Sequence, residues 1–382
     1  MAKKKQPANN AYVIKTFEQR YSSKKTESIM PFINERLSAN QTSIDKARYE
    51  KPTTDNTVAR QSRFHFKPED VMNALRTNII GQDDVLSSVE EMLYLVKADF
   101  GIKHRPLAVN LFLGPTGVGK TETVKIIAKS ILGSTDNFCR IDMNTLAQEH
   151  YAASLTGAPP GYVGSKEGHS LFDSDAIKGS FSKPGIVLFD ELEKASTEVI
   201  RALLNVLDTG HLVLSSGTHE IDFSNCLIFM TSNIGVKELN AHRAAQNKGI
   251  KKWLGGNTID EKSHLKQALQ KKFDPEFLNR IDRILSYDYL SDEFLDKILD
   301  VELEKLNLRL KAKNATLELD ETARQQLYTY YDEEYGARNL AQHIRVKLEP
   351  LVAREILKDD QSTQFIIKYV DDKFSISPDI NT

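Results

Sequence analysis

The stretch Ala108–Thr123, AVNLFLGPTGVGKTET, decides the fold of this chain. Its centre, Gly114–Thr121, matches the phosphate-binding pattern G-x-x-x-x-G-K-[ST] at every fixed position. Glycines let such a loop curl into a nest whose N–H groups point at one anion, and the following helix adds the positive end of its dipole. Leu107–Leu113 before it is typical of a buried strand, and Thr121–Leu132 after it has helical apolar spacing. The stretch therefore predicts a site for a nucleoside triphosphate.

Two side chains of this loop have distinct expected tasks. Lys120 is expected to reach the β- and γ-phosphates, and the Thr121 hydroxyl is expected to hold Mg²⁺. A flexible Gly-rich turn would not explain the lysine. The other loop residues expected to contact the nucleotide are Pro115, Thr116, Gly117, Val118, Gly119 and Glu122.

Composition narrows the class of protein. At 382 residues the chain has room for two or three domains, and 40% hydrophobic with 27% charged residues is ordinary for a globular protein. The sequence has no apolar run long enough to span a bilayer, and its first ten residues, MAKKKQPANN, lack the apolar core of a signal peptide. Its two cysteines, Cys139 and Cys226, each fall in a strand-like apolar run, as core residues in a reducing compartment do. We expect a cytoplasmic protein without a membrane contact.

The charge is unevenly distributed along the chain. Residues 1–65 carry 13 Lys and Arg against 6 Asp and Glu, whereas the remainder carries 38 against 47. This basic leader is poor in apolar residues, so we expect it to be largely disordered, with one possible partner- or adaptor-binding helix in Lys15–Leu37. Because the body of the chain is acidic, nucleic acid is not an expected partner.

Two further apolar runs end in polar residues. Gly185–Glu191, GIVLFDE, would place Asp190 beside the Mg²⁺ site and Glu191 where it can polarise a water. Leu227–Asn233, LIFMTSN, is a second such run. Strands that alternate with helices predict a parallel sheet, whose ligands gather at the carboxyl ends of the strands. The polar residues expected to converge there are Lys120, Asp190, Glu191 and Asn233.

The pattern changes near residue 287. A polar stretch, Val236–Lys262, is expected to be a loop or short helices. Beyond residue 287 the sequence predicts a smaller α+β domain, whose elements are helices at Glu293–Leu310, Asp320–Tyr331 and from Tyr335 through Ile356, and a strand or hairpin at Gln364–Ile376. The expected division is a leader at 1–65, a nucleotide-binding domain at 66–287 and a small domain at 288–382.

Eight short motifs then occur in one order: GPTGVGKTE, IDMN, GAPPGYVG, LFDELEKA, LLNVLDTG, MTSNIG, PEFLNRID and YGARNL. Over about residues 70–370 the chain resembles an AAA+ ATPase of the Clp (heat-shock-100) family, in particular the second ATPase module of ClpA, ClpB and ClpC. The resemblance implies an α/β AAA+ module with a parallel sheet between helices, a small C-terminal α+β lid domain, and ATP with Mg²⁺. It implies a single-module version, with no family counterpart for residues 1–65.

Three catalytic roles follow from the resemblance. Asn233 is similar to the sensor-1 residue that helps position the attacking water, and Arg280 resembles the arginine finger that reaches the neighbouring subunit's nucleotide. Arg338 resembles sensor 2, which reports the nucleotide state to the small domain. Each residue has a simpler alternative, namely a helix cap for Asn233, a surface ion pair for Arg280 and a helix-end preference for Arg338.

The resemblance also places a base-binding segment and a pore loop. Ile79 and Ile80 belong to a segment similar to the one that flanks the adenine. Tyr162, with Val163 beside it, resembles the pore-loop aromatic that grips a threaded polypeptide, although Tyr162 between glycines could also be a turn residue. His169 stands where relatives usually have glycine, and 210–218, the second pore loop, departs from the family pattern, which leaves substrate preference open.

The implied function is ATP-driven unfolding or remodelling of protein substrates by a ring, and the resemblance implies that this ring is a hexamer. Two alternatives stay open: an ATPase dedicated to dismantling or loading one protein complex, and the unfoldase subunit of a Clp-type protease. A nucleic-acid motor is a weaker third. Docking to a ClpP-like peptidase is disfavoured because the Ile-Gly-Phe or Ile-Gly-Leu tripeptide of protease-coupled relatives is not recognisable after Asn233, where 249–256 reads GIKKWLGG.

Overall fold

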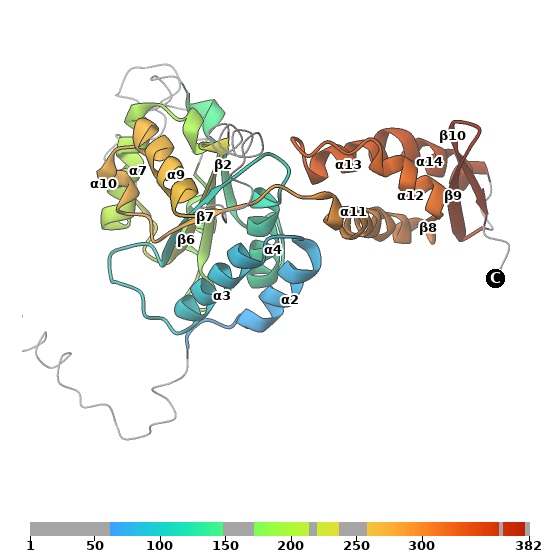
Figure 1. Cartoon of the computed structure of the whole chain (residues 1–382). Helices are drawn as coiled ribbons and strands as arrows, with labels where there is room; N and C mark the ends of the chain where they lie inside the picture. Colours follow the sequence, from blue (N-terminus) through green and yellow to red (C-terminus); the bar gives the residue numbers. More distant parts are fainter. Residues whose placement is uncertain (1–61, 148–171, 214–219, 237–257, 359–361, 379–382) are drawn as a thin grey trace, which may run out of the picture. The chain divides into compact units, whose positions relative to one another are not determined.

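A computed structural model describes residues 62–147, 172–213, 220–236, 258–358 and 362–378 (Figure 1). All of these residues belong to one compact unit, Ser62–Thr382. The predicted pore-loop residues Tyr162 and Val163, together with His169 and the leader, lie outside the described residues.

Five parallel strands form the central sheet, in the order β2-β3-β6-β1-β7. These strands are β1 (Ala108–Leu113), β2 (Cys139–Asp142), β3 (Gly185–Asp190), β6 (Cys226–Ser232) and β7 (Arg283–Ser286). Every residue of β1, β3 and β6 is buried, as expected for strands covered on both faces. The two cysteines are buried thiols, in β2 and β6.

Helices cover both faces of this sheet (Figure 1). On one face, Phe112 and Phe229 share a core with α2 (Pro68–Asn78), α3 (Asp83–Lys97) and α4 (Lys120–Leu132). On the other face, the alternate strand residues pack against a second group of helices. This group contains α6 (Ser174–Lys178), α7 (Thr197–Thr209), α9 (Thr258–Lys272) and α10 (Pro275–Leu278). The alternation of side chains along each strand thus builds two cores from one apolar run.

Short elements connect these layers. A 3₁₀ turn, η2 (Met143–Leu146), follows β2, and η3 (Leu192–Lys194) follows β3. An antiparallel pair consists of β4 (His211–Val213), at the start of the predicted second pore loop 210–218, and β5 (Glu220–Asp222), which follows that loop. Residues 214–219 between the two strands lie outside the described residues. Of the stretch Val236–Lys262, predicted as loop or short helices, 237–257 lie outside the described residues, and the part from Thr258 onward belongs to the 15-residue helix α9.

The C-terminal part is α+β, as predicted. Its helices are η5 (Asp292–Phe294), α11 (Leu295–Leu310), η6 (Lys311–Lys313), α12 (Glu321–Tyr328), α13 (Ala337–His343) and α14 (Glu349–Lys358), with a π-helical turn, Ile344–Leu348, joining the last two. Its sheet has the order β10-β9-β8, formed by β8 (Thr316–Leu319), β9 (Gln364–Val370) and β10 (Lys373–Pro378). The predicted hairpin is therefore present, whereas β8 was not predicted. The fold class is confirmed: a parallel sheet between helices, followed by a smaller domain with its own sheet.

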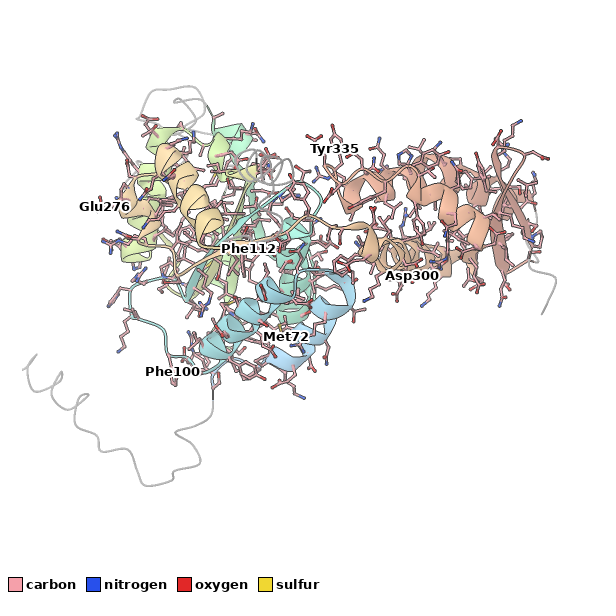
Figure 2. All side chains as sticks on the ribbon, in the orientation of Figure 1. Met72, Phe100, Phe112, Glu276, Asp300 and Tyr335 are labelled. Atoms are coloured by element: carbon pink, nitrogen blue, oxygen red, sulfur yellow. The ribbon has the colours of Figure 1, made fainter. Side chains whose placement is uncertain are left out.

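Phe112 provides a test of this core. It lies inside the part of the chain that contains the five-stranded sheet (Figure 2), and its ring centroid is 5.6 Å from that of Phe229 and 5.4 Å from that of Tyr287. Phe112→Ala should lower the free energy of unfolding by about 3–5 kcal/mol, because it removes buried area and leaves a cavity. Phe100→Ala is the control, since Phe100 is 78% exposed. Denaturant unfolding followed by circular dichroism measures both, and equal effects would contradict this description of the core.

Candidate functional site

The phosphate loop joins β1 to α4 through glycines that other residues could not replace. Gly117 and Gly119 have φ of +78° and +106°, in the region that side chains disfavour. A Cβ at Gly117 would also lie 2.0 Å from the carbonyl oxygen of Tyr335. The Ala337 N–H donates to the Gly117 carbonyl at 3.1 Å, so the turn that opens α13 rests directly on the loop.

Lys120 is folded back into the loop and is only 8% exposed. Its Nζ donates to the carbonyls of Gly114 and Pro115 at 2.6 and 2.5 Å, and to Asn233 Oδ1 at 2.9 Å. Burial lowers the pKa of Lys120 to about 8, against the opposing attraction of nearby carboxylates. The ammonium is thus held, poorly hydrated, where an anion would be a strong partner.

Asn233 links this lysine to Glu193. The Asn233 backbone N–H and Nδ2 both lie 3.3 Å from Glu193 Oε1, to which they donate. Since Oδ1 accepts from Lys120, the amide is engaged at both ends within the site. The Glu193 carboxylate therefore fixes the orientation of the predicted sensor-1 side chain.

Asp190 ends β3 among three donors. Thr231 Oγ1 and Thr121 Oγ1 donate to its Oδ1 at 2.5 and 3.2 Å, and Arg140 Nη2 donates to its Oδ2 at 2.6 Å. Burial alone would raise the pKa of Asp190, but the hydrogen bonds from Thr231 and Arg140 outweigh it and hold this pKa below its ordinary value. The group is an anion throughout the neutral range.

Glu191 follows in a strained conformation, with a φ of +59° that non-glycine residues rarely adopt. Its backbone N–H donates to Thr231 Oγ1 at 3.0 Å, and its Oε2 accepts from Asn144 Nδ2 at 2.5 Å. Asn144 is fixed in turn, because its own N–H donates to Asp142 Oδ1 at 2.9 Å. The Glu191 carboxylate is therefore held beside the end of β3 by Asn144, and it lines the same cavity as the phosphate loop.

These groups line one cavity of about 440 Å³. The predicted residues on its wall are Ile79, Ile80, Thr116, Gly117, Val118, Gly119, Lys120, Thr121, Glu122, Asp190, Glu191, Asn233 and Arg338. Pro115 contributes its carbonyl to Lys120 instead. Leu290, Ile298 and Lys305 of the C-terminal part complete the wall, and Lys305 Nζ lies 3.5 Å from Glu122 Oε1. The cavity has the mixed apolar and charged lining of a nucleotide site.

Arg280 is not on this wall. Its Nη2 lies 3.1 Å from Asp208 Oδ1, the surface ion pair that the simpler sequence alternative named. Arg105 binds the backbone here, with Nε donating to the Leu207 carbonyl and Nη2 to the Arg280 carbonyl, each at 3.2 Å. Arg280 thus lies on a separate face, fixed to the end of α7.

Sequence reasoning did not find several residues of the site: Arg140, Asn144, Glu193, Thr231, Lys305 and, near Arg280, Arg105 and Asp208. Some signal existed, because Asn144 and Thr231 stand inside the recognised motifs IDMN and MTSN. Arg140 precedes the last residue of β2, Asp142, by two positions and pairs with Leu188 of β3, so only knowledge of strand order could bring it to Asp190.

The residues present fit a divalent cation bound together with phosphate. The Thr121 hydroxyl and Asp190 carboxylate are hard oxygen donors 3.2 Å apart. Within the described residues there is no cluster of three or more His, Cys, Asp or Glu that could hold a metal. Mg²⁺ characteristically binds through one or two protein oxygens with phosphates and waters completing the octahedron.

No helix in the described part of the chain is long and apolar enough to cross a membrane.

Comparison with known proteins agrees with this geometry. The profile of the AAA domain (Cdc48 subfamily) matches residues 105–284, and that of the C-terminal, D2-small domain of ClpB protein matches residues 290–367. Together with the loop and the acidic strand end, these matches define an AAA+ ATPase.

Similar individual proteins indicate which family of AAA+ ATPases the chain belongs to. The chain is 44% identical to the ATP-dependent protease ATP-binding subunit-like protein AmiB of Pseudomonas aeruginosa, over 79% of this chain and 83% of that protein. A similarly described protein of Rhodococcus erythropolis is 41% identical over 76% and 84%, and the chaperone protein ClpB of Clostridium tetani is 38% identical over 75% and 32%. A closed-state structure of Hsp104 with ATPγS and FITC-casein matches with a TM-score of 0.68 at 29% identity, over 81% of this chain and 52% of that one.

The chain belongs to the Clp (heat-shock-100) family of AAA+ ATPases, and it is an ATP-hydrolysing enzyme of that family. It spans most of the first two relatives but only about a third of the ClpB protein and half of the Hsp104 chain.

The Lys120 environment generates a pH prediction. Phosphate binding requires the charged ammonium, but with a pKa of about 8 the lysine of the empty site loses its proton as the pH rises through 8. Nucleotide binding must therefore take up a proton, about 0.2 per site at pH 7.5 and about 0.9 at pH 9 if the bound lysine stays charged. Calorimetry of ADP binding in buffers of different ionisation enthalpy measures this uptake. Lys120→Arg, charged at every pH used, should abolish the trend, and a flat profile in the unmodified chain would contradict the buried ammonium.

Proposed function

We propose that this chain forms a ring, of six subunits, that hydrolyses ATP to unfold or remodel protein substrates by drawing polypeptide through a central pore. The observation that carries the ring is the position of Arg280 outside its own subunit's cavity. This position, away from the nucleotide site of its own subunit, supports a role of the predicted arginine finger in the site of a neighbouring subunit. A head-to-tail interface of this kind closes into a ring when its rotation allows.

Within each subunit we assign the roles as follows. Thr121 and Asp190 would hold a Mg²⁺ ion, which would neutralise charge on the phosphates of ATP, and Lys120 binds those phosphates. Glu191 polarises the attacking water while Asn233 positions it. Ile79 and Ile80 flank the adenine, and Arg338 relates the nucleotide state to the small domain. The hydrogen bond from the Ala337 N–H to the Gly117 carbonyl supports that last role, because it links the turn before α13 directly to the phosphate loop.

Substrate engagement rests on the sequence alone. Tyr162 and Val163 are proposed to contact the threaded polypeptide, since an aromatic tip makes apolar and stacking contacts with many sequences. The Hsp104 structure to which the chain is similar was obtained with casein, a polypeptide. We also propose the domain division at 65/66 and 287/288, and a partner- or adaptor-binding role for the basic leader.

A second candidate is the ATPase subunit of a protease. It is favoured by the names of the two relatives from Pseudomonas aeruginosa and Rhodococcus erythropolis, both described as ATP-dependent protease ATP-binding subunit-like. The missing docking tripeptide argues against a ClpP-like peptidase. Adding a Clp-type peptidase to the assay below separates the two, because a protease subunit would convert unfolding of a tagged reporter into degradation.

The role of Arg280 is testable by complementation. Arg280→Ala should bind ATP normally but hydrolyse it about a thousandfold more slowly, the loss usual for a missing arginine finger. Mixed with equal amounts of Glu191→Gln, which is inactive yet keeps Arg280, it should recover roughly a quarter of wild-type activity, because that share of interfaces unites an intact Glu191 with an intact arginine. ATPase assays of the two variants alone and mixed give the answer. Activity that stays absent on mixing in assembled rings would remove the trans role.

The pore role is tested with Tyr162→Ala. ATPase activity should stay within about twofold of wild type, whereas the rate of unfolding of a tagged fluorescent reporter should fall at least about tenfold, because the aromatic grip is lost. Tyr162→Phe keeps the ring and is the matched control. Unfolding at the wild-type rate in Tyr162→Ala would exclude threading by this loop, and a wild-type chain without any unfolding activity would favour a dedicated remodelling ATPase.

A further inference from the structure

Arg140 occupies a position that the proposed roles leave unexplained. Its guanidinium Nη2 is 2.6 Å from Asp190 Oδ2, on the carboxylate proposed to bind Mg²⁺. The Arg140 side chain is 49% exposed, whereas that of Asp190 is 11% exposed. The flexible side chain of Arg140 therefore places its guanidinium against the fixed, nearly buried carboxylate of Asp190.

Strand order explains how it does so. β2 is the edge strand beside β3, and Arg140 pairs with Leu188 while Asp142 pairs with Asp190. Arg140 thus lies two residues short of the strand end that carries the site, and its long side chain spans the difference. It is a wall residue of the nucleotide cavity. Its guanidinium can leave Asp190 without disturbing a core.

The oxygens of Asp190 are divided between different donors. Oδ1 accepts from the hydroxyls of Thr231 and Thr121, and Oδ2 accepts from Arg140. Both hydroxyls can rotate and present lone pairs to a metal, but a guanidinium has donors only. A divalent cation and Arg140 on the same carboxylate would repel each other at a distance of a few ångströms, in a site of reduced dielectric. The divalent cation and Arg140 therefore compete for the Asp190 carboxylate.

We propose that Arg140 is the resident counter-cation of Asp190, which Mg²⁺ displaces when it binds with nucleotide. The inference rests on the proposed role of Asp190 in metal binding. Without metal, Arg140 neutralises a carboxylate that would otherwise repel the phosphates. With metal, that neutralisation is redundant. Arg140 therefore weakens the dependence of nucleotide binding on Mg²⁺ and lowers the affinity of the site for the metal.

Two other roles give different results. A structural ion pair would affect stability but leave the metal dependence unchanged. A permanent phosphate ligand would contribute to nucleotide affinity equally with and without metal, or more with it. Only competition for Asp190 makes loss of the guanidinium harmful chiefly when the metal is absent.

The experiment measures the Kd of a fluorescent ADP analogue with excess Mg²⁺ and with EDTA. In Arg140→Gln the ratio of the metal-free Kd to the Mg²⁺ Kd should rise about three- to tenfold over wild type, the effect of one charge-assisted bond to a largely buried carboxylate. The metal-free Kd should rise because the bare Asp190 carboxylate repels the phosphates, and the Mg²⁺ Kd should not rise because the metal no longer has to displace a guanidinium. By linkage, the Mg²⁺ concentration that half-saturates the nucleotide complex should fall by a similar factor.

Matched variants make the test decisive. Arg140→Lys keeps the charge and should return the ratio to within about twofold of wild type. Arg140→Met keeps the apolar stem and should behave like Arg140→Gln, which guards against a folding defect peculiar to one variant. Arg76→Gln removes a surface arginine bound to Glu90 at 2.6 Å, away from the cavity, and should change nothing.

An unchanged ratio in Arg140→Gln and Arg140→Met, with normal Mg²⁺-dependent binding in wild type, would overturn the inference alone. So would an equal loss of affinity with and without metal. A wild-type chain that bound nucleotide without regard to Mg²⁺, or not at all, would instead overturn the proposed site, and the inference with it.

Discussion

The buried ammonium of Lys120 is the constraint on which the rest of the site depends. Removing an ammonium from water is costly unless it is paired and hydrogen-bonded. Here two carbonyls of its own loop and the amide oxygen of Asn233 provide the hydrogen bonds, while the carboxylates around it supply the charge. Satisfying one lysine thus fixes the curvature of the loop, the orientation of Asn233 and the direction of the end of β6.

A parallel sheet makes such an arrangement predictable. The carboxyl ends of parallel strands meet at one edge of a sheet, so the convergence of Lys120, Asp190 and Asn233 was predictable once their strands were expected to be parallel. The structure places these three strands, β1, β3 and β6, next to one another. The sequence therefore predicted the fold class, the nucleotide loop and the convergence of these residues. The roles of Arg280, Arg338 and Tyr162 came from the resemblance and remain predictions.

The features that the sequence did not predict are the short strands and the side-chain contacts that form between neighbouring strands. β7 and β8 have four residues each, too few for alternation to be distinguished from a loop. The partners of Asp190 and Glu191 are set by which strand lies beside which, and by side-chain reach. Arg140 and Asn144 look like ordinary polar residues beside a strand end until β2 is placed next to β3.

The segment that carries Arg280 is anchored to the strand that ends at the phosphate loop. The Asp282 N–H donates to the Val109 carbonyl at 3.0 Å, and the Val109 N–H donates to Asp282 Oδ2 at 2.8 Å, so the Arg280 segment is fixed to the beginning of β1. The same strand ends at the phosphate loop, about 20 Å away at the usual rise for six residues. β1 is a buried central strand, paired on both sides, and it cannot bend independently of the sheet. We therefore expect β1 to couple the phosphate loop mechanically to the arginine that is proposed to serve the next subunit.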